Sequence, residues 1–397
     1  GLGSAGAWLT GWTISLAYIS VAAWEGIALS TAINYLFPNL KFGYLWNVSG
    51  FDIYISWSAV GIIGSVFLTT LNVIGIKPAA VFQMFAILLL LIVGMLHMFG
   101  GFAFGQAAHM APAFTDMKGF GNVLLMTPSM YIGFDMVAKS AEEMNIPLKK
   151  ISGVLIFAII AAGAWYVLII LGTAMAAPAS VLQNAGGTAA DMAAYTYRSP
   201  LFAKILIIGG VCGIVTSWNG FIVGASRILF AMGRARMLPR IFGTVHPKYG
   251  TPGAAVLFVG AICCVTPLLG ERSFIWLVNV AAFSTVAAYL LVSVSYCAIR
   301  RREPNLRKPF ALKRGMPAGV TALLASLLFL LCYAPLSPLA LTWPTEWGVI
   351  LIWAALGLVF WGIRRYTEPQ AALSYAEREA LIFGEYAREG TEPGAKR

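Results

Sequence analysis

Residues 121–150, GNVLLMTPSMYIGFDMVAKSAEEMNIPLKK, decide how this sequence is interpreted. The segment begins as an apolar run long enough to enter a bilayer, but it carries Pro128, Gly133 and Asp135 where a simple membrane anchor has leucine or valine. Proline removes a backbone donor and glycine relaxes the backbone, so the sequence predicts a helix that is broken between Pro128 and Gly133.

A break at membrane depth points to function. Unpaired backbone groups are costly in hydrocarbon and are tolerated only where they face protein or line a polar cavity. Discontinuous helices of this kind form the solute sites of secondary transporters. The alternative is a helix that is kinked at proline and binds no ligand.

The composition is that of a polytopic membrane protein. Of the 397 residues, 59% are hydrophobic and only 11% are charged, against roughly a quarter charged in soluble domains. The net charge of +11 does not indicate nucleic acid, because the basic residues form short clusters between apolar spans. The five cysteines lie within apolar segments without metal-type spacing, so we expect core residues and neither a metal nor another cofactor.

Ten segments are long enough to cross the hydrocarbon of a bilayer, about 30 Å, as helices. They are residues 7–36, 54–76, 79–101, 121–144, 151–176, 201–232, 252–269, 273–299, 317–335 and 346–364. The predicted fold class is therefore an all-α polytopic membrane protein. A short helix-like stretch is expected at residues 188–197, and a charged tail, residues 367–397, follows the last span.

The distribution of lysine and arginine predicts the orientation. Eighteen of them fall on one side of the alternating spans, whereas the other side holds only Lys41, Lys118, Arg198, Lys204 and Arg272. Because positively charged short loops stay in the cytosol, Gly1 and the C-terminal tail are both placed there. The expected location is a bacterial inner membrane or a plasma membrane.

From residue 121 onward the predicted spans are one broken helix, one of ordinary length, one long helix (residues 201–232) and two of ordinary length. Before them stand a long span (residues 7–36) and two of ordinary length. This order indicates a five-helix unit that occurs twice in opposite orientations, as in many secondary transporters. If this unit is repeated, we expect the first copy to lack its two opening helices. The sequence also starts at Gly1 within apolar residues, without an initiator methionine or a signal sequence, so we expect it to be truncated at its amino end.

Several motifs resemble the amino acid-polyamine-organocation permeases. YIGFDMVAKSAEEMNIP, residues 131–147, resembles the sixth-helix motif of that family, and GASRILFAMGRARMLPRIFGTVHPKYGTP, residues 224–252, resembles its eighth helix and the following loop. The opening segment GLGSAGAWLTGW and the sequence NVIGIKPAAVFQ resemble the third helix and the passage from the fourth to the fifth.

The resemblance implies a LeuT-like inverted-repeat fold of twelve helices, of which ten are present and the first two are missing. Residues 1–101 would then be the remainder of the first repeat, helices three to five, and residues 121–300 the second repeat, helices six to ten. Residues 316–366 would form two peripheral helices, and residues 367–397 a cytosolic tail.

The same resemblance implies a substrate site at the broken helix. The family's sixth helix offers backbone carbonyls to the substrate amino group, which transfers to Tyr131, Ile132 and Gly133. The family often places a large aromatic residue as a lid at the position of Ser129, so Tyr131 or Phe134 is the candidate lid here. Asp135 is expected to cap the inner half of the broken helix rather than to contact substrate.

Two residues are candidates for ion coupling. Glu25 lies near the middle of the first span, where an ionised side chain is costly, so it is either a carboxylate that takes up and releases a proton or a neutral, hydrogen-bonded structural residue. His97 either faces the membrane interface or titrates during transport. Sodium-independent members of the family often carry a lysine where this sequence has Leu90.

The long span at residues 201–232 supplies further candidates. Trp218 and Asn219 lie where the family approaches substrate, and Thr216 and Ser217 lie where sodium-coupled relatives bind their ion. The alternative for all four is packing and hydrogen bonding between helices.

An inner gate is a further hypothesis. Glu142 and Glu143 end the broken helix, and Arg227, Arg234 and Arg236 follow the long span on the same side, so ion pairs could form and break there. Exposed pairs contribute only about 0–1 kcal/mol, which favours a topology signal as the role of the arginines.

The function predicted from the sequence is secondary active transport of an amino acid or related amine by alternating access, as proton-coupled symport or exchange. The expected partners are that small molecule, the lipid bilayer and a proton or sodium ion. An enzyme is disfavoured because HExxH, GxSxG and P-loop motifs are missing, and a channel because no filter sequence is visible. A sensor that binds amino acid without turnover remains the alternative.

Overall fold

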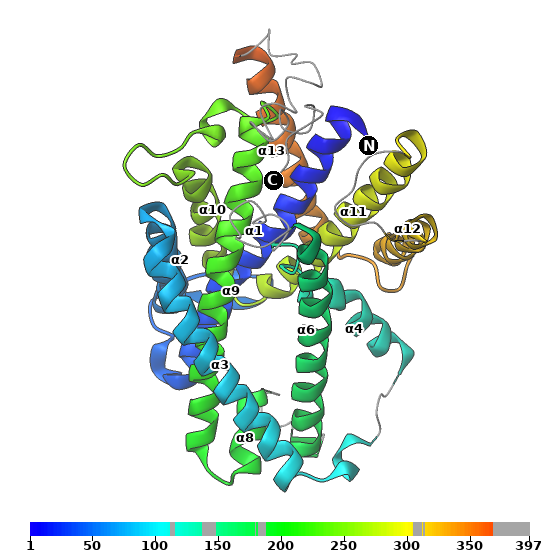
Figure 1. Cartoon of the computed structure of the whole chain (residues 1–397). Coiled ribbons are helices and arrows are strands. Elements are labelled where there is room, and N and C mark those ends of the chain that lie inside the picture. The colour runs from blue at the N-terminus through cyan, green and yellow to red at the C-terminus, as the bar shows by residue number, and fades with distance from the viewer. Residues whose placement is uncertain are drawn as a thin grey trace.

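The computed structural model describes residues 1–111, 116–136, 148–178, 180–181, 188–304, 312 and 314–367 (Figure 1). Its helices and strands are α1 (Gly3–Leu36), β1 (Tyr44–Val48), β2 (Phe51–Tyr54), α2 (Ile55–Ile74), α3 (Ile76–Phe104), α4 (Met117–Met130), α6 (Leu148–Ala176), α8 (Ala189–Thr196), α9 (Pro200–Arg234), α10 (Gly253–Val265), α11 (Ser273–Arg302), α12 (Gly315–Tyr333) and α13 (Thr345–Thr367). Short 3₁₀ turns follow α1, α3, α9 and α10.

Eight of the described helices are long and apolar enough to cross a membrane. The other two predicted spans are occupied by shorter helices: α4 has 14 residues, and α10 with its 3₁₀ extension covers Gly253–Leu269. The short helix expected near residue 188 is present as α8, which Thr188 and Asp191 begin with a reciprocal capping box. The division into repeats stays a prediction, and residues 368–397 of the expected tail lie outside the described residues.

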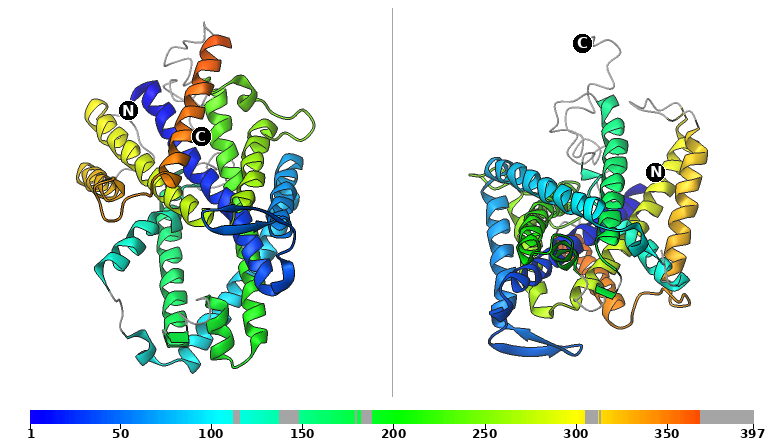
Figure 2. Two further views of the ribbon diagram at one scale, coloured as in Figure 1. Left: turned by 180° about the vertical axis from the view of Figure 1, so that it is seen from behind. Right: turned by 90° about the horizontal axis from the view of Figure 1, so that it is seen from below.

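The described chain is helical, as predicted, apart from one hairpin. Strands β1 and β2 pair antiparallel and project from the helices (Figure 2). The two turn residues, Ser49 and Gly50, both have positive φ, and the Asn47 side chain accepts a hydrogen bond from the Gly50 N–H at 2.9 Å. This is the geometry of a type I′ turn, and the Ser-Gly pair between runs rich in β-branched and aromatic residues is the signal that could have predicted it.

Helix α1 lies at the centre of the molecule and makes its most extensive contacts with α9 and α11 (Figure 1). Its middle is buried on all sides, from Ser15 to Ala23. A helix that is apolar all round is buried rather than placed at a surface. At one end, the indoles of Trp12 and Trp353 stack at 4.3 Å and each donates a 3.0 Å hydrogen bond to the other's backbone carbonyl, which holds α13 against α1.

The ends that carry arginine lie together. The Arg302 guanidinium donates a 3.3 Å hydrogen bond to the carbonyl of Gly1, so the end of α11 meets the start of α1. The end of α13, with Arg364 and Arg365, lies at the same end of the molecule (Figure 1). Helix α8 lies toward the opposite end (Figure 1).

Helices α3 and α6 approach closely through small residues. A Cβ atom at Gly101 would overlap the backbone carbonyl of Gly172, and one at Gly105 would overlap the carbonyl of Met175. In a membrane, where lipid is as apolar as a leucine side chain, such close backbone contact is a main source of helix association.

Replacing Gly101 with alanine should therefore push α3 and α6 apart. We expect Gly101→Ala to lower the free energy of unfolding by about 1–3 kcal/mol, the usual cost of overpacking. The control is Gly153→Ala on α6, where a Cβ atom meets nothing within 4 Å. Unfolding in detergent micelles gives the free energy of unfolding of both variants. An equal change in this free energy for Gly101→Ala and Gly153→Ala would contradict a close contact between α3 and α6 at Gly101.

Candidate functional site

The predicted break in the membrane helix is present. Helix α4 ends at Met130, two residues after Pro128, and residues 131–135 form a turn in which Gly133 has a φ of +110°. Only glycine adopts this backbone conformation without strain. The next helical residue is Met136, and residues 137–147 lie outside the described part of the chain.

Part of the backbone at the break is hydrogen-bonded within the turn. The Ile132 N–H donates to the Ser129 carbonyl at 3.4 Å, and the Met136 N–H donates to the Gly133 carbonyl at 3.0 Å. The Tyr166 hydroxyl on α6 donates to the carbonyl of Met130, the last residue of α4, at 2.9 Å. Of the three carbonyls predicted to meet substrate, that of Gly133 already has one partner in the turn.

Asp135 is held by a tyrosine from α1. The hydroxyl of Tyr18, which is completely buried, donates a hydrogen bond to the Asp135 carboxylate. The ring of Phe221 on α9 lies edge-on against Tyr18 at 5.3 Å and would lie 3.5 Å from a Cβ atom at Gly133. The turn is therefore enclosed by α1 and α9, as irregular backbone in a membrane requires.

The two candidate lid residues point to different neighbours. Tyr131 lies against Tyr166 of α6, with ring centroids 5.9 Å apart, whereas Phe134 lies 6.2 Å from Tyr289 of α11. The turn thus presents one aromatic side chain toward each of two helices.

Two of the predicted coupling residues meet. The Ser217 hydroxyl on α9 donates a hydrogen bond to the carboxylate of Glu25, which is 6% exposed in the middle of α1. Thr216 is also buried, but its hydroxyl donates to the Gly213 carbonyl of its own helix at 2.9 Å.

Trp218 and Asn219 lie within protein contacts. The indole of Trp218 is fully buried and faces Gly26 of α1 and Gly64 of α2. The Asn219 side chain accepts from Asn72 at 2.8 Å and donates to Gln83 at 3.1 Å, which links α9 to α2 and α3. A role of either residue in substrate binding stays a prediction.

One of the two interpretations of His97 placed its side chain at the membrane interface. The structure places it inside the protein instead. It is 4% exposed in the seam between α3 and α6, where Nε2 lies 2.8 Å from the Thr173 hydroxyl. It also borders a cavity of about 310 Å³ that Leu90 lines from the same helix. Leu90 itself reaches the backbone of α9 near Gly213.

The proposed inner gate is only partly described. Arg227 is half-buried on α9, whereas Glu142 and Glu143 lie outside the described residues. Ion pairing between them stays a prediction.

The family of the chain follows from a comparison with known proteins. A family model described as amino acid permease matches residues 2–362. The chain belongs to the amino acid permease family. It is therefore an integral membrane protein of a transporter family and not an enzyme, and membership implies a LeuT-like fold.

Individual relatives of the chain differ in what their names say they carry. The branched-chain amino acid permease BcaP of Bacillus subtilis is 29% identical over 251 residues, 61% of this chain and 50% of that protein. The methylthioribose transporter of the same organism is 24% identical over 328 residues, 78% of this chain and 67% of that protein. Human cationic amino acid transporter 4 is 27% identical over 320 residues, 77% of this chain and 49% of that protein. The matched region thus spans about half of the length of two of these relatives.

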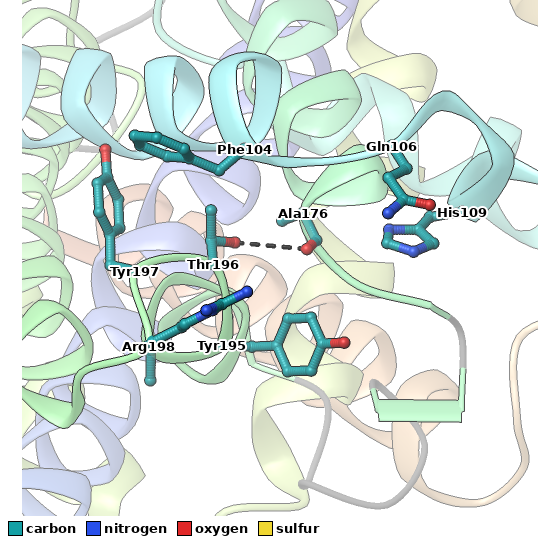
Figure 3. Close-up of a pocket in the computed structure, with 9 residues that line it drawn as sticks. Phe104, Gln106, His109, Ala176, Tyr195, Thr196, Tyr197 and Arg198 are labelled. Atoms are coloured by element: carbon teal, nitrogen blue, oxygen red, sulfur yellow. Dashed lines mark hydrogen bonds between the residues drawn. The ribbon is translucent and has the colours of Figure 1, made fainter.

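A second feature of the permease lies away from the break, at the end of the molecule near α8. A cavity of about 760 Å³ is bordered by the aromatic and polar residues drawn in Figure 3, among them His109, Tyr195 and Arg198. Thr196 joins α8 to the end of α6 through a 3.5 Å hydrogen bond to the Ala176 carbonyl. None of the residues predicted to bind substrate is among its described lining residues.

Sequence reasoning missed Tyr18, the residue of α1 that contacts the break. A signal was present, because Tyr18 and Glu25 are seven residues apart and so lie on one face of a helix whose other buried polar residues are serines. Polar groups repeated at this spacing in a buried membrane helix mark the face toward the interior.

Removing the Tyr18 hydroxyl tests whether this contact supports transport. We expect Tyr18→Phe to reduce amino acid uptake by about ten- to a hundredfold, since a hydrogen bond to a charged group contributes about 1.5–3 kcal/mol. Uptake per folded protein in proteoliposomes gives the measurement.

The matched control is Tyr197→Phe, which removes a 2.7 Å hydrogen bond to the Leu96 carbonyl far from the break. If both variants lose uptake equally, the Tyr18 contact is only a general contribution to stability.

Proposed function

We propose that the permease is a secondary active transporter that moves a neutral amino acid, or a related small amine, by alternating access. The observation that carries the proposal is the interruption of α4 at Met130, whose turn is enclosed by α1 and α9 and bonded to Tyr18. Irregular backbone at membrane depth is retained where it serves a solute site.

The substrate amino group is placed at the end of α4. The carbonyls of a helix C-terminus carry partial negative charge, so they stabilise an ammonium group without a buried counter-ion. The carbonyls of Tyr131 and Ile132 lie in the turn that follows α4 and add two more acceptors beside those of the helix end. Tyr131 and Phe134 then border the substrate side chain on the two sides that they already occupy.

The charges near the site favour a neutral side chain. The two carboxylates nearby, Glu25 and Asp135, both accept hydrogen bonds from protein hydroxyls. A cationic side chain would need a carboxylate to compensate its charge at membrane depth, and these two already serve the protein.

Alternating access is assigned to two groups of helices. Helices α1, α2, α9 and α10 contact one another and form one unit of the fold. Helix α4 reaches this unit through its terminal turn, while its regular part contacts α11. We assign the motion to α4 and α6 against the four-helix unit, with a LeuT-like inverted repeat as the underlying architecture.

Counterflow tests transport directly. Proteoliposomes loaded with unlabelled leucine should accumulate labelled leucine transiently when they contain the permease, because exchange through one site needs no gradient of its own. Serine, lysine and methylthioribose as competitors define the substrate class. Saturable leucine binding without counterflow would identify the protein as a sensor, and a current that scales with voltage without saturation would identify a channel.

Coupling is proposed to involve protons and Glu25. Its carboxylate is buried on α1 and contacts Ser217, and the same helix holds the turn after α4 through Tyr18. Movement of α4 against α1 therefore changes the environment in which a proton is held.

Glu25→Gln should therefore abolish the stimulation of uptake by external acid while leucine counterflow persists, since exchange requires no net proton movement. Uptake with and without an imposed pH gradient measures the stimulation by acid, and leucine counterflow is measured separately without a gradient. Ser217→Ala is the companion variant and should shift the pH dependence without abolishing it. Unchanged pH dependence in Glu25→Gln excludes this carboxylate as the coupling group.

A further inference from the structure

A cavity lies at the end of the molecule where the arginines gather. It has a volume of about 310 Å³ and is bordered by three segments, the start of α1, the turn after α9 and the end of α13. Among its lining residues are Trp8, Arg236, Leu358, Trp361 and Arg364. It is remote from the break in α4, and none of its lining residues takes part in the proposed transport.

Arg236 occupies a backbone position that normally belongs to glycine. Helix α9 ends in a Schellman motif, in which the Arg236 N–H donates to the Gly233 carbonyl at 3.0 Å and the Met237 N–H donates to the Met232 carbonyl at 2.8 Å. The residue after the cap then takes a positive φ, which is +52° for Arg236. A residue with a Cβ atom is less stable there than glycine by roughly 1 kcal/mol, so the guanidinium is retained against a conformational cost.

The described residues that line this cavity include two arginines and no acidic residue. Arg236 and Arg364 both border the cavity. No described carboxylate lies within 4 Å of the Arg236 guanidinium. The cavity is therefore suited to an anion.

The outer wall of the cavity faces the bilayer. Leu358 and Trp361, one turn apart on α13, are 64% and 42% exposed. Tryptophan is enriched at membrane interfaces, where its ring meets both headgroups and acyl chains. The Arg365 guanidinium lies 5.4 Å from the Trp361 ring and adds positive charge at the same level. The ligand thus meets cations on one side and an apolar, lipid-exposed surface on the other.

We propose that this cavity binds the phosphate of an anionic phospholipid in the leaflet on the arginine-rich side. The positive-inside rule makes this the cytosolic leaflet, and basic pockets between helices on that side are suited to anionic headgroups. Arg236 and Arg364 contact the phosphate, Trp8 and Trp361 border the glycerol region, and an acyl chain lies along Leu358. Occupancy ties α13 and the turn after α9 to the start of α1.

The test measures lipid-dependent stability of the purified permease and of Arg236→Gly. Glycine suits the backbone conformation, so this variant removes the charge without straining the turn. The thermal midpoint is followed in neutral detergent as phosphatidylglycerol or phosphatidylcholine is added. Phosphatidylglycerol should stabilise the parent protein more than phosphatidylcholine does, and Arg236→Gly should need about fivefold more of it for the same effect. In phosphatidylcholine the variant should be at least as stable as the parent.

Two control variants and one soluble phosphate show whether the effect belongs to this cavity. Arg301→Gln removes an exposed arginine at the same end of the molecule but outside the cavity, and it should keep the response to phosphatidylglycerol. Arg236→Lys, which keeps a charge, should lose less than the glycine variant. Glycerol 3-phosphate at the same concentration should produce no shift, because it lacks acyl chains.

Equal stabilisation of the parent by the two lipids would overturn the proposal. So would equal responses of Arg236→Gly and Arg301→Gln, which would indicate attraction to the general surface charge. A full effect of glycerol 3-phosphate would assign the cavity to a soluble phosphate instead of a lipid.

Discussion

A bilayer provides no water to hydrogen-bond with a backbone that leaves its helix, and the rest of this structure depends on that constraint. Helix α4 stops at Met130, so residues 131–135 must be surrounded by protein. Helices α1 and α9 supply the enclosure through Tyr18 and Phe221, and α6 adds a hydroxyl at the end of α4. The arrangement encloses an irregular turn on several sides and leaves polar backbone beside aromatic rings.

Helix α1 connects the parts on which transport is proposed to depend. Tyr18 contacts the turn, and two helical turns further on Glu25 contacts Ser217 of α9. Both contacts join a hydroxyl to a carboxylate, and Tyr18 and Glu25 are both buried on one regular helix. A change in the protonation of Glu25 and a change at the break therefore act on the same rigid element. This proximity explains why a long, almost uncharged helix carries these two polar side chains.

The two ends of the molecule are built differently. One end carries α8, with a wide cavity beside aromatic residues. The other end brings the starts and ends of α1, α11 and α13 together with their arginines. The sequence predicts that charge at that end is a topology signal, but Arg236 occupies a glycine-type position, which a topology signal alone does not require.

The sequence alone determined the membrane class, most span boundaries, the break after Pro128 and the start of α8, because hydropathy, proline, glycine and capping act over a few residues. It did not predict the partner of each buried polar group. Tyr18 and Asp135 are 117 positions apart, and Glu25 and Ser217 are 192 apart. Their spacing shows that Tyr18 and Glu25 share one face of α1, but only packing against neighbouring helices decides which residues that face meets. For the same reason, the sequence did not predict that His97 lies between α3 and α6 beside Thr173, or that Trp218 faces Gly26 and Gly64.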